Sequence, residues 1–289
     1  MNRDQQRESR TILRRIEAHL RQSHIYMGAD EAALGFVDVI HHTTNTLRTL
    51  NYVTPRRNTA WVSGNHVQQG LDYLHEHGRL HRVRFVDGLY PPVFVRALRD
   101  LKLELEEEIP MMVYKKPQEP RPLTPINTSI TFLLAQTSRD LAIWWYVWRN
   151  AYYDVAVSSV EPLLIGRDMH AVYFKHQINL VMLRHNYPIG VMRITLHEGT
   201  AHLVAHALLK ELRQPPWEHM IRSVALDVAL HHGADLVFVA GKTEDDRRRY
   251  REMGFIDSGS IVSYAESRKK ANEHAEVYDD TLAQSVFII

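Results

Sequence analysis

The alternation of apolar and polar positions divides this chain into segments with helical spacing and segments with strand spacing. The first helix is predicted over Arg7–Gln22, where Ile12, Ile16 and Leu20 fall on one stripe. Glycine or proline at the ends of several other segments gives their boundaries. Further helices are predicted over residues 67–78, 91–101, 139–152, 217–232 and 244–253.

Short alternating or continuously apolar runs predict the strands between these helices. A hairpin is predicted in the N-terminal half, with strands over residues 46–53 and 59–64 joined by a turn at 54–58. Further strands are predicted over residues 81–87, 105–115, 128–134, 178–185, 189–196, 200–209, 235–240 and 259–265. Helices and strands that alternate in this way are typical of an α/β protein, here with a mixed sheet.

A proline-rich stretch separates two halves of the chain. Residues 115–125 contain four prolines and several charges. Such a stretch continues neither a helix nor a central strand, because proline has no backbone N–H to donate. We therefore predict an N-terminal domain over residues 1–117 and a C-terminal domain over residues 118–289.

Composition and charge narrow the classes of function. The formal net charge is +1 over 289 residues, so no overall field recruits nucleic acid or an acidic membrane. The basic run Arg247–Arg249 follows Asp245 and Asp246, which favours a solvated helix face over a nucleic-acid interface. The chain has no cysteine, which excludes disulfides, thiolate zinc sites and a cysteine nucleophile.

The remaining features point to an ordinary soluble protein. No apolar run approaches the roughly 18 residues that a membrane-spanning helix needs, and the charged N-terminus has no apolar core of a secretion signal. We therefore predict a cytoplasmic protein with no membrane partner. The 18 histidines include pairs such as His41-His42, but no third ligand at a suitable spacing supports them, so we predict no metal site.

One segment of the C-terminal half carries a family resemblance. The string "RRRYREMGF", with Tyr250 before Gly254 and Phe255, resembles the last helix of the GNAT acyltransferase fold. Upstream, "HHGADLVFVAG" and "YPIGVMRITLHEGTAHLVAHALL" resemble the preceding strands. The resemblance covers about Ser129 to Tyr264 and implies an acyl-CoA N-acyltransferase (GNAT) fold.

The N-terminal half resembles a second, shortened copy of the same fold. Residues 67–87, 91–101 and 105–115 repeat the helix, strand, helix, strand order. This copy has no tyrosine before a Gly-Phe pair, so the resemblance implies a tandem protein whose N-terminal copy is degenerate. An unrelated α/β cap is the alternative interpretation of this half.

The resemblance assigns chemical roles to two residues. Tyr250 matches the family's tyrosine, which protonates the departing CoA thiolate; a phenol is protonated at neutral pH. His202 stands where the family often has a glutamate that acts as the base, and histidine titrates near neutrality. Ring packing for Tyr250 and an ordinary strand hydrogen bond for His202 remain the alternatives.

The resemblance also implies where acetyl-CoA, the expected co-substrate, is bound. Ala205, His206 and Ala207 match the strand positions that bind the pantetheine arm. The family's phosphate loop is Arg/Gln-x-x-Gly-x-Gly/Ala, and its glycines expose backbone N–H groups to the pyrophosphate. The corresponding stretch and the residue after the next strand are Arg213, Gln214, Pro215, Pro216, Trp217, Glu218 and Thr243.

The altered loop leaves two functions open. Pro216 and Glu218 occupy the two small positions, which removes an N–H donor and adds a negative charge. The first function is transfer of an acyl group from acetyl-CoA to an amine of a small molecule or peptide, without a metal. The second is a non-catalytic GNAT-fold protein that binds another ligand or a partner. The sequence identifies neither the acceptor nor the choice between monomer and homodimer.

Overall fold

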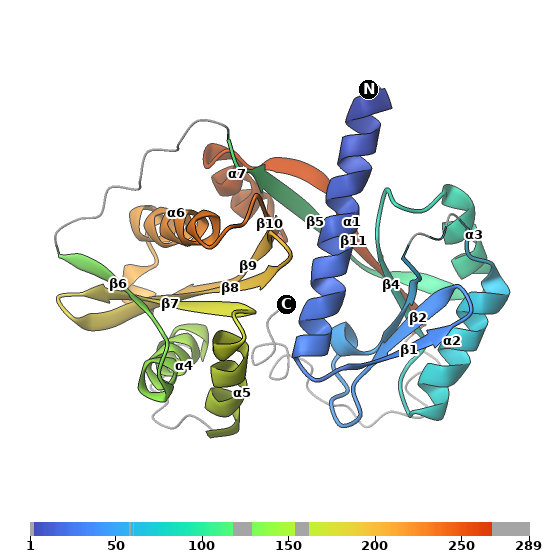
Figure 1. Ribbon diagram of the computed structural model, residues 1–289, viewed down its shortest axis with the longest axis horizontal. Helices are drawn as coiled ribbons and strands as arrows, with labels where there is room; N and C mark the ends of the chain where they lie inside the picture. The colour runs from blue at the N-terminus through green and yellow to red at the C-terminus, as the bar shows by residue number, and fades with distance from the viewer. Residues whose placement is uncertain (1–2, 58, 60, 118–128, 154–161, 268–289) are drawn as a thin grey trace. The chain divides into compact units, whose positions relative to one another are not determined.

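The computed structural model describes residues 3–57, 59, 61–117, 129–153 and 162–267, and these form two compact units (Figure 1). The N-terminal unit comprises the described residues up to Met111 together with residues 257–267. The C-terminal unit comprises Met112–Ile256. This division places a strand from the end of the chain with the N-terminal unit. The domain boundary at residues 117/118 stays a prediction.

The N-terminal unit is a sheet in the order β1-β2-β3-β4-β11 with three helices. β1, β2 and β3 pair antiparallel, β3 and β4 pair parallel, and β11 pairs antiparallel with β4. Its elements are α1 (Arg3–Tyr26), β1 (Asp30–Leu34), β2 (Val37–His41), the 3-10 turn η1 (Arg48–Leu50), β3 (Tyr52–Pro55), α2 (Gly64–Glu76), β4 (Arg82–Val86), α3 (Pro92–Asp100), β5 (Leu103–Lys115), which continues into the C-terminal unit, and β11 (Ile256–Glu266).

Helices cover both faces of this sheet. The core between the sheet and α2 and α3 includes Val53, Val83 and Phe85 from the strands with Leu71 and Leu98 from the helices. The long helix α1 lies on the opposite face (Figure 1). The sheet therefore has one apolar face under two helices and another face under a single helix.

The C-terminal unit is a sheet in the order β10-β9-β8-β7-β6. β6 to β9 pair antiparallel with their neighbours, and β10 runs parallel to β9. Its elements are β6 (Ile130–Leu134), α4 (Ser138–Tyr153), α5 (Pro162–Tyr173), β7 (Gln177–Arg184), β8 (Tyr187–His197), β9 (Thr200–Leu208), the 3-10 turn η2 (Lys210–Leu212), α6 (Pro215–His231), β10 (Leu236–Ala240) and α7 (Glu244–Glu252).

Helices α4 and α5 cover one face of this sheet and α6 covers the other (Figure 1). The aromatic run of α4 belongs to the core, since Trp144 and Trp145 are fully buried. Arg193 of β8 lies 4.2 Å from the Trp144 ring centroid and pairs with the buried carboxylate of Asp168. The aromatic helix is therefore packed against the sheet and forms no open ligand cage.

The two units repeat one order of elements. In the N-terminal unit, strands β2 and β3 lead into α2, β4, α3 and β5. In the C-terminal unit, strands β8 and β9 lead into α6, β10 and α7, and the next strand along the chain is β11 of the N-terminal unit. The mixed α/β fold in two copies, predicted from the sequence, is thus what the structure has.

One local prediction was wrong. The predicted hairpin after Thr54 does not form, because β3 pairs with β2 and β4 and the chain then enters α2 at Gly64. Residues 46–64 have the local pattern of a hairpin, with two apolar runs around a turn. The parallel partner of β3 is β4, which lies further along the chain and leaves no signal in that local pattern. Helix α5 had not been predicted. Among the described residues, no helix is long and apolar enough to cross a membrane.

Candidate functional site

A fork opens between two parallel strands of the C-terminal unit. The ladder joins β9 and β10 at three positions, the last of them His202 opposite Phe238. β9 continues from there to Leu208. On its other side, β9 carries a bulge at Val204, because Arg193 pairs with Ala205 whereas Ile194 pairs with Leu203. The bulge and the short ladder leave the second half of β9 without β10 beside it.

Tyr250 lies on α7 and is packed next to this fork. It is 4% exposed, and its ring contacts Phe255 at 5.2 Å between ring centroids. The Arg222 guanidinium carbon lies 4.8 Å from the ring centroid. Burial raises the pKa of the Tyr250 phenol, and the positive charge of Arg222 offsets part of that effect. The phenol is therefore a hydrogen-bond donor across the neutral range.

Arg222 on α6 connects three elements around the fork. Its Nη2 donates to His206 Nε2 of β9 at 2.8 Å and to Asp246 Oδ1 of α7 at 2.9 Å. It is 2% exposed, and its Nε and Nη1 atoms are buried without a hydrogen-bond partner among the described residues. Two unused donors on a buried cation are costly and mark a place that an anion would stabilise.

His206 is neutral at this position. Its Nε2 accepts the hydrogen bond from Arg222, so that nitrogen carries no proton. Burial, reinforced by the charge of Arg222, lowers the pKa of His206 to about 3. His206 therefore positions Arg222 and does not take up a proton near neutral pH.

An open pocket of about 530 Å³ lies where the start of α6 meets α7. A volume of this size is within the range of small-molecule sites. Four of the lining side chains are basic or titratable bases, so the pocket suits an anion. The lining residues are Pro215, Pro216, His219, Arg222, Arg248, Arg249, Glu252 and Met253.

The start of α6 offers no free backbone donor to that pocket. Pro215 and Pro216 have no N–H groups. The next two amides, those of Trp217 and Glu218, both donate to the Gln214 carbonyl, at 3.0 and 3.2 Å. All four amide positions of the first turn are thus without a donor for a phosphate. Beyond the N–H group that Pro216 removes, the first turn of α6 thus also lacks the amides of Trp217 and Glu218 as free donors.

Several predicted cofactor-binding residues have structural partners. Arg213 donates from Nε to the Leu208 carbonyl at 3.1 Å and from Nη2 to the Ala151 carbonyl. Glu218 forms an ion pair with Arg249. Thr243 caps α7, because its hydroxyl accepts the Asp246 amide at 3.1 Å. These contacts fix the loop and the helix start; their role toward a cofactor stays a prediction.

The other predicted residues are distributed around the fork. Ala205 and Ala207 lie on β9 opposite Arg193 and Val191 of β8. Gln214 is exposed and precedes α6 as its N-cap residue. Trp217 packs at the edge of the core.

His202 lies at the closed end of the fork. Its ring stacks on Phe238, with centroids 4.1 Å apart and an interplanar angle of 10°. It is 3% exposed and belongs to the last pair of the ladder. Tyr250 and His206 thus both contact Arg222, whereas His202 lies at the end of the ladder between β9 and β10.

Arg222 and Asp246 are site residues that were not predicted from the sequence. The sequence contains a signal for Arg222. Residues 220–229 are mostly apolar, and Arg222 is their one basic side chain. A cation on the inward side of an amphipathic helix needs a buried partner or a ligand. Only the packing of α6 against β9 and α7 shows which partners it has.

Comparison with known proteins identifies the fold. No family model matches the sequence, and no curated protein matches it. The structure is similar to a GCN5-related N-acetyltransferase from Kribbella flavida, with a TM-score of 0.67 and 14% identity, covering 88% of this chain and 95% of the other. The chain therefore has the GNAT fold.

Two further solved structures have the same fold at lower similarity. A tandem GNAT protein from the clavulanic acid biosynthesis pathway has a TM-score of 0.53 and 10% identity, with 74% of each chain covered. The C-terminal domain of a putative lysylphosphatidylglycerol synthetase from Agrobacterium fabrum has a TM-score of 0.51 and 8% identity, covering 93% of this chain and 95% of the other. At these identities the likeness carries the fold alone.

Proposed function

We propose that this GNAT-fold protein is an acyl-CoA-dependent N-acyltransferase that works at the fork between β9 and β10. The observation that carries the proposal is the placement of buried Tyr250 against Arg222, which lines an open pocket and has two buried donors without a hydrogen-bond partner among the described residues. The pocket suits the phosphates of the acyl-CoA, and the phenol suits the thiolate that leaves.

The reaction has a defined course in this arrangement. The nitrogen lone pair of the acceptor amine attacks the thioester carbonyl carbon, and the tetrahedral intermediate collapses with loss of the carbon–sulfur bond. Tyr250 gives its proton to the departing sulfur, so the products are an amide and free CoA. The proton lost by the amine returns to the phenolate through solvent, which restores Tyr250.

The base that receives the amine proton is His202 in this proposal, acting through water. Its buried, stacked position at the closed end of the fork supports positioning more directly than proton transfer. An amine that reaches the site already deprotonated needs no base at all. Replacement of His202 by Gln separates the two cases, because only a general base shifts the acidic limb of the pH profile of kcat/KM.

The phosphates of the acyl-CoA are held in this proposal by side chains and not by helix amides. Arg222 offers Nε and Nη1, and His219 and Arg248 lie in the same pocket. This replaces the backbone donors that Pro215 and Pro216 remove from the first turn of α6. A guanidinium suits the purpose because its planar fork binds two phosphate oxygens at once.

Calorimetry with acetyl-CoA and CoA tests the proposal first. Saturable binding with an affinity better than millimolar supports it, and no heat of binding at millimolar cofactor overturns it. A panel of small amines and peptide N-termini, with release of free thiol as the signal, then tests turnover.

Tyr250→Phe tests the acid role. We expect turnover to fall by about 100-fold, the usual scale for loss of a general acid, with acetyl-CoA affinity within about two-fold of wild type. Tyr187→Phe is the matched control, since Tyr187 is 60% exposed at the start of β8. Equal loss of turnover and affinity in Tyr250→Phe contradicts the acid role.

The second candidate function is ligand or partner binding without catalysis. The lack of a free amide in the first turn of α6 favours it, because that turn is where the fold usually holds the pyrophosphate. Binding of CoA without any turnover of the amine panel, and unchanged behaviour of Tyr250→Phe, distinguishes this function from the first.

A further inference from the structure

The arginines of the pocket between α6 and α7 already have carboxylate partners within the protein. Three arginines line the pocket, and each forms an ion pair with an acidic side chain of α6 or α7. An anion that enters the pocket therefore has to compete with a carboxylate for each arginine. The pairs are Arg222 with Asp246, Arg248 with Asp245, and Arg249 with both Glu218 and Asp245.

The two aspartates of α7 are each held by more than one group. Asp246 accepts from Arg222 at 2.9 Å and from the Thr243 hydroxyl at 2.9 Å. Asp245 pairs with two arginines of its own helix. Both aspartates lie in the first turn of α7, where the positive end of the helix dipole favours a negative charge. Displacement of either carboxylate would break several contacts at once.

Glu218 of α6 is the paired carboxylate with the fewest partners. Among the described residues, Arg249 is the one ionic partner of its side chain. Arg249 in turn also pairs with Asp245, at 2.6 Å, so it stays anchored to α7 when Glu218 is replaced. The Glu218 side chain is 19% exposed, which leaves it a path to solvent. An anion therefore displaces Glu218 more easily than either aspartate.

Glu218 also lies on the helix face that borders the pocket. Pro215, three residues before it, and Arg222, four residues after it, both line the pocket, and residues at these spacings are neighbours on a helix. Arg222 has buried Nε and Nη1 atoms without a hydrogen-bond partner among the described residues. Glu218 pairs with Arg249 and leaves these two donors unused. A ligand with two anionic groups can therefore contact both arginines, whereas the single carboxylate of Glu218 contacts one.

We propose that Glu218 is an internal competitor of the bound anion: its carboxylate holds Arg249 in the free protein, and a phosphate group that enters the pocket replaces it there. A ligand with one negative charge exchanges one anion for another and gains little. A diphosphate group brings a second phosphate to the unused donors of Arg222, so the competition selects for it. The natural ligand rests on the proposed function, which assigns this pocket to the phosphates of acyl-CoA.

Titration calorimetry of the full chain with inorganic pyrophosphate tests this inference. Glu218→Gln keeps the shape of the side chain and removes its charge. We expect this variant to bind pyrophosphate about five- to ten-fold more tightly than wild type, the scale of one charged hydrogen bond that no longer competes. Equal affinities in wild type and Glu218→Gln, or no saturable binding by either, overturns the inference.

Glu244→Gln is the matched control for the loss of one negative charge. Glu244 is an acid of α7 that is 66% exposed, and its partners Arg247 and Arg251 are not among the residues lining the pocket. Its affinity for pyrophosphate should stay within about two-fold of wild type, because exposed charges are well screened. A gain as large as that of Glu218→Gln would indicate a general effect of charge and contradict the inference.

A double-mutant cycle shows whether the gain depends on Arg249. Arg249→Gln alone should weaken pyrophosphate binding by about ten-fold, since it removes one charged donor. Adding Glu218→Gln to that variant should then bring no further gain, because the competition has lost its object. The same gain in both backgrounds contradicts competition for Arg249. Thermal unfolding without ligand checks that each variant is folded before affinities are compared.

CoA and acetate separate this inference from the proposed function. We expect CoA to gain about the same factor as pyrophosphate in Glu218→Gln, and acetate to bind wild type far more weakly than pyrophosphate. Pyrophosphate binding that depends on Glu218, with no binding of CoA by any variant, supports the inference and contradicts the acyltransferase. CoA binding by wild type with the same affinity in Glu218→Gln does the reverse. Acetate that binds as tightly as pyrophosphate contradicts the selection for a diphosphate.

Discussion

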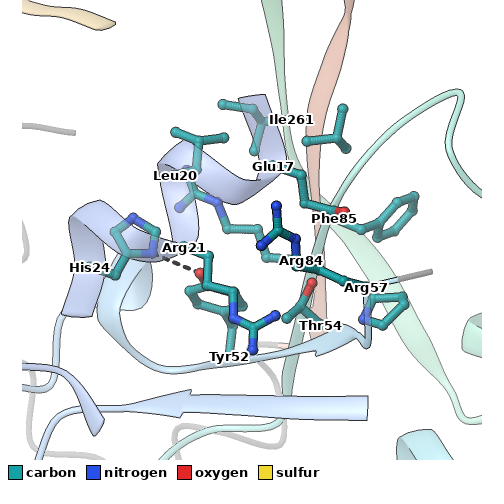
Figure 2. Close-up of a pocket in the computed structure, with 12 residues that line it drawn as sticks. Glu17, Leu20, Arg21, His24, Tyr52, Thr54, Arg57, Arg84, Phe85 and Ile261 are labelled. Atoms are coloured by element: carbon teal, nitrogen blue, oxygen red, sulfur yellow. Dashed lines mark hydrogen bonds between the residues drawn. The ribbon is translucent and has the colours of Figure 1, made fainter. Parts of the chain in front are cut away.

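The two units place the same elements around a fork of parallel strands and then use the fork differently. In the N-terminal unit, β3 and β4 pair at Val53 opposite Val83, and a small pocket lined in part by Arg84 lies between α1 and these strands (Figure 2). In the C-terminal unit, β9 and β10 pair at three positions, and Arg222 bridges His206 and Asp246 beside the fork. One backbone design thus carries a buried arginine at each fork, and the arginines differ in their partners.

The helices that follow the first fork strand also differ. α2 begins at Gly64, where an added Cβ atom would meet nothing within 4 Å. α6 begins with Pro215 and Pro216, and its next two amides are already bonded. The helix start in the N-terminal unit therefore has free space at Gly64, whereas the C-terminal unit has Tyr250 on α7. The two copies of the fold therefore differ at the start of the helix that follows the first fork strand.

Arg222→Met should have the largest effect on the C-terminal fork. It removes the unpaired donors that we assign to the phosphates, and we expect CoA affinity to fall by about 10- to 100-fold, as for loss of a charged hydrogen bond. The pKa of His206 should rise toward its ordinary value, because Arg222 is one of the groups that lowers it. Calorimetry and histidine NMR measure the two effects.

Arg251→Gln is the control for this change, since Arg251 is a more exposed arginine of α7 that pairs with Glu244. CoA affinity in this variant should match wild type. If Arg251→Gln and Arg222→Met weaken binding equally, the effect is one of general charge and the phosphate assignment fails.

Glu17→Gln should reveal the cost of the buried acid in the N-terminal unit. The pKa of Glu17 is raised from 4.5 to about 7, so between these values the folded state binds more protons than the unfolded state. The free energy of unfolding of wild type therefore falls as the pH rises from about 4.5 to about 7.

In Glu17→Gln this part of the pH dependence is absent. The variant should gain about 2 kcal/mol over wild type at pH 8 and nothing at pH 4, after allowance for partial solvent exposure. Denaturant titration at both pH values measures the difference, and Glu8→Gln, on the exposed side of α1, serves as control. A gain at pH 4 as large as that at pH 8 contradicts the interpretation.

Pro216→Gly should make the start of α6 more similar to that of α2. We expect its effect to be smaller than those of Arg222→Met and Glu17→Gln. It returns one N–H group to the first turn of α6, and we expect CoA affinity to rise by about three- to ten-fold. The more flexible glycine should cost about 1 kcal/mol of stability. Pro92→Ala makes a comparable change at the start of α3 and should leave CoA binding unchanged. An unchanged affinity in Pro216→Gly would place the phosphates elsewhere.

Much of the secondary structure follows from local patterns in the chain. The helices that became α1, α2, α3, α4, α6 and α7 were all predicted from apolar spacing and from end signals such as Gly78 and Gly254. The capping of α7 by Thr243 fits the acidic first turn that follows it. These features depend on residues within a few positions of one another, which is why a single sequence displays them.

Strand partners and buried charges did not follow from local patterns. Residues 81–87 were predicted to be a strand and form β4. Their alternation does not indicate what covers the face that carries Arg82 and Arg84. The structure buries Arg82 and Arg84 there, with Arg82 paired to Glu106. The same holds for β11, which comes from the end of the chain and pairs with β4 in the N-terminal unit.

The sequence by itself determined most of the element types, the tandem α/β organisation, and the resemblance that points to Tyr250. Only the tertiary structure decided that β9 and β10 separate after His202 and that Arg222 keeps two donors unpaired. It also decided that Arg84 is buried beside the Tyr52 ring. The reason is physical: propensity and capping act between near neighbours in the chain, whereas burial and the pairing of charges depend on elements far apart in sequence that meet only in the fold.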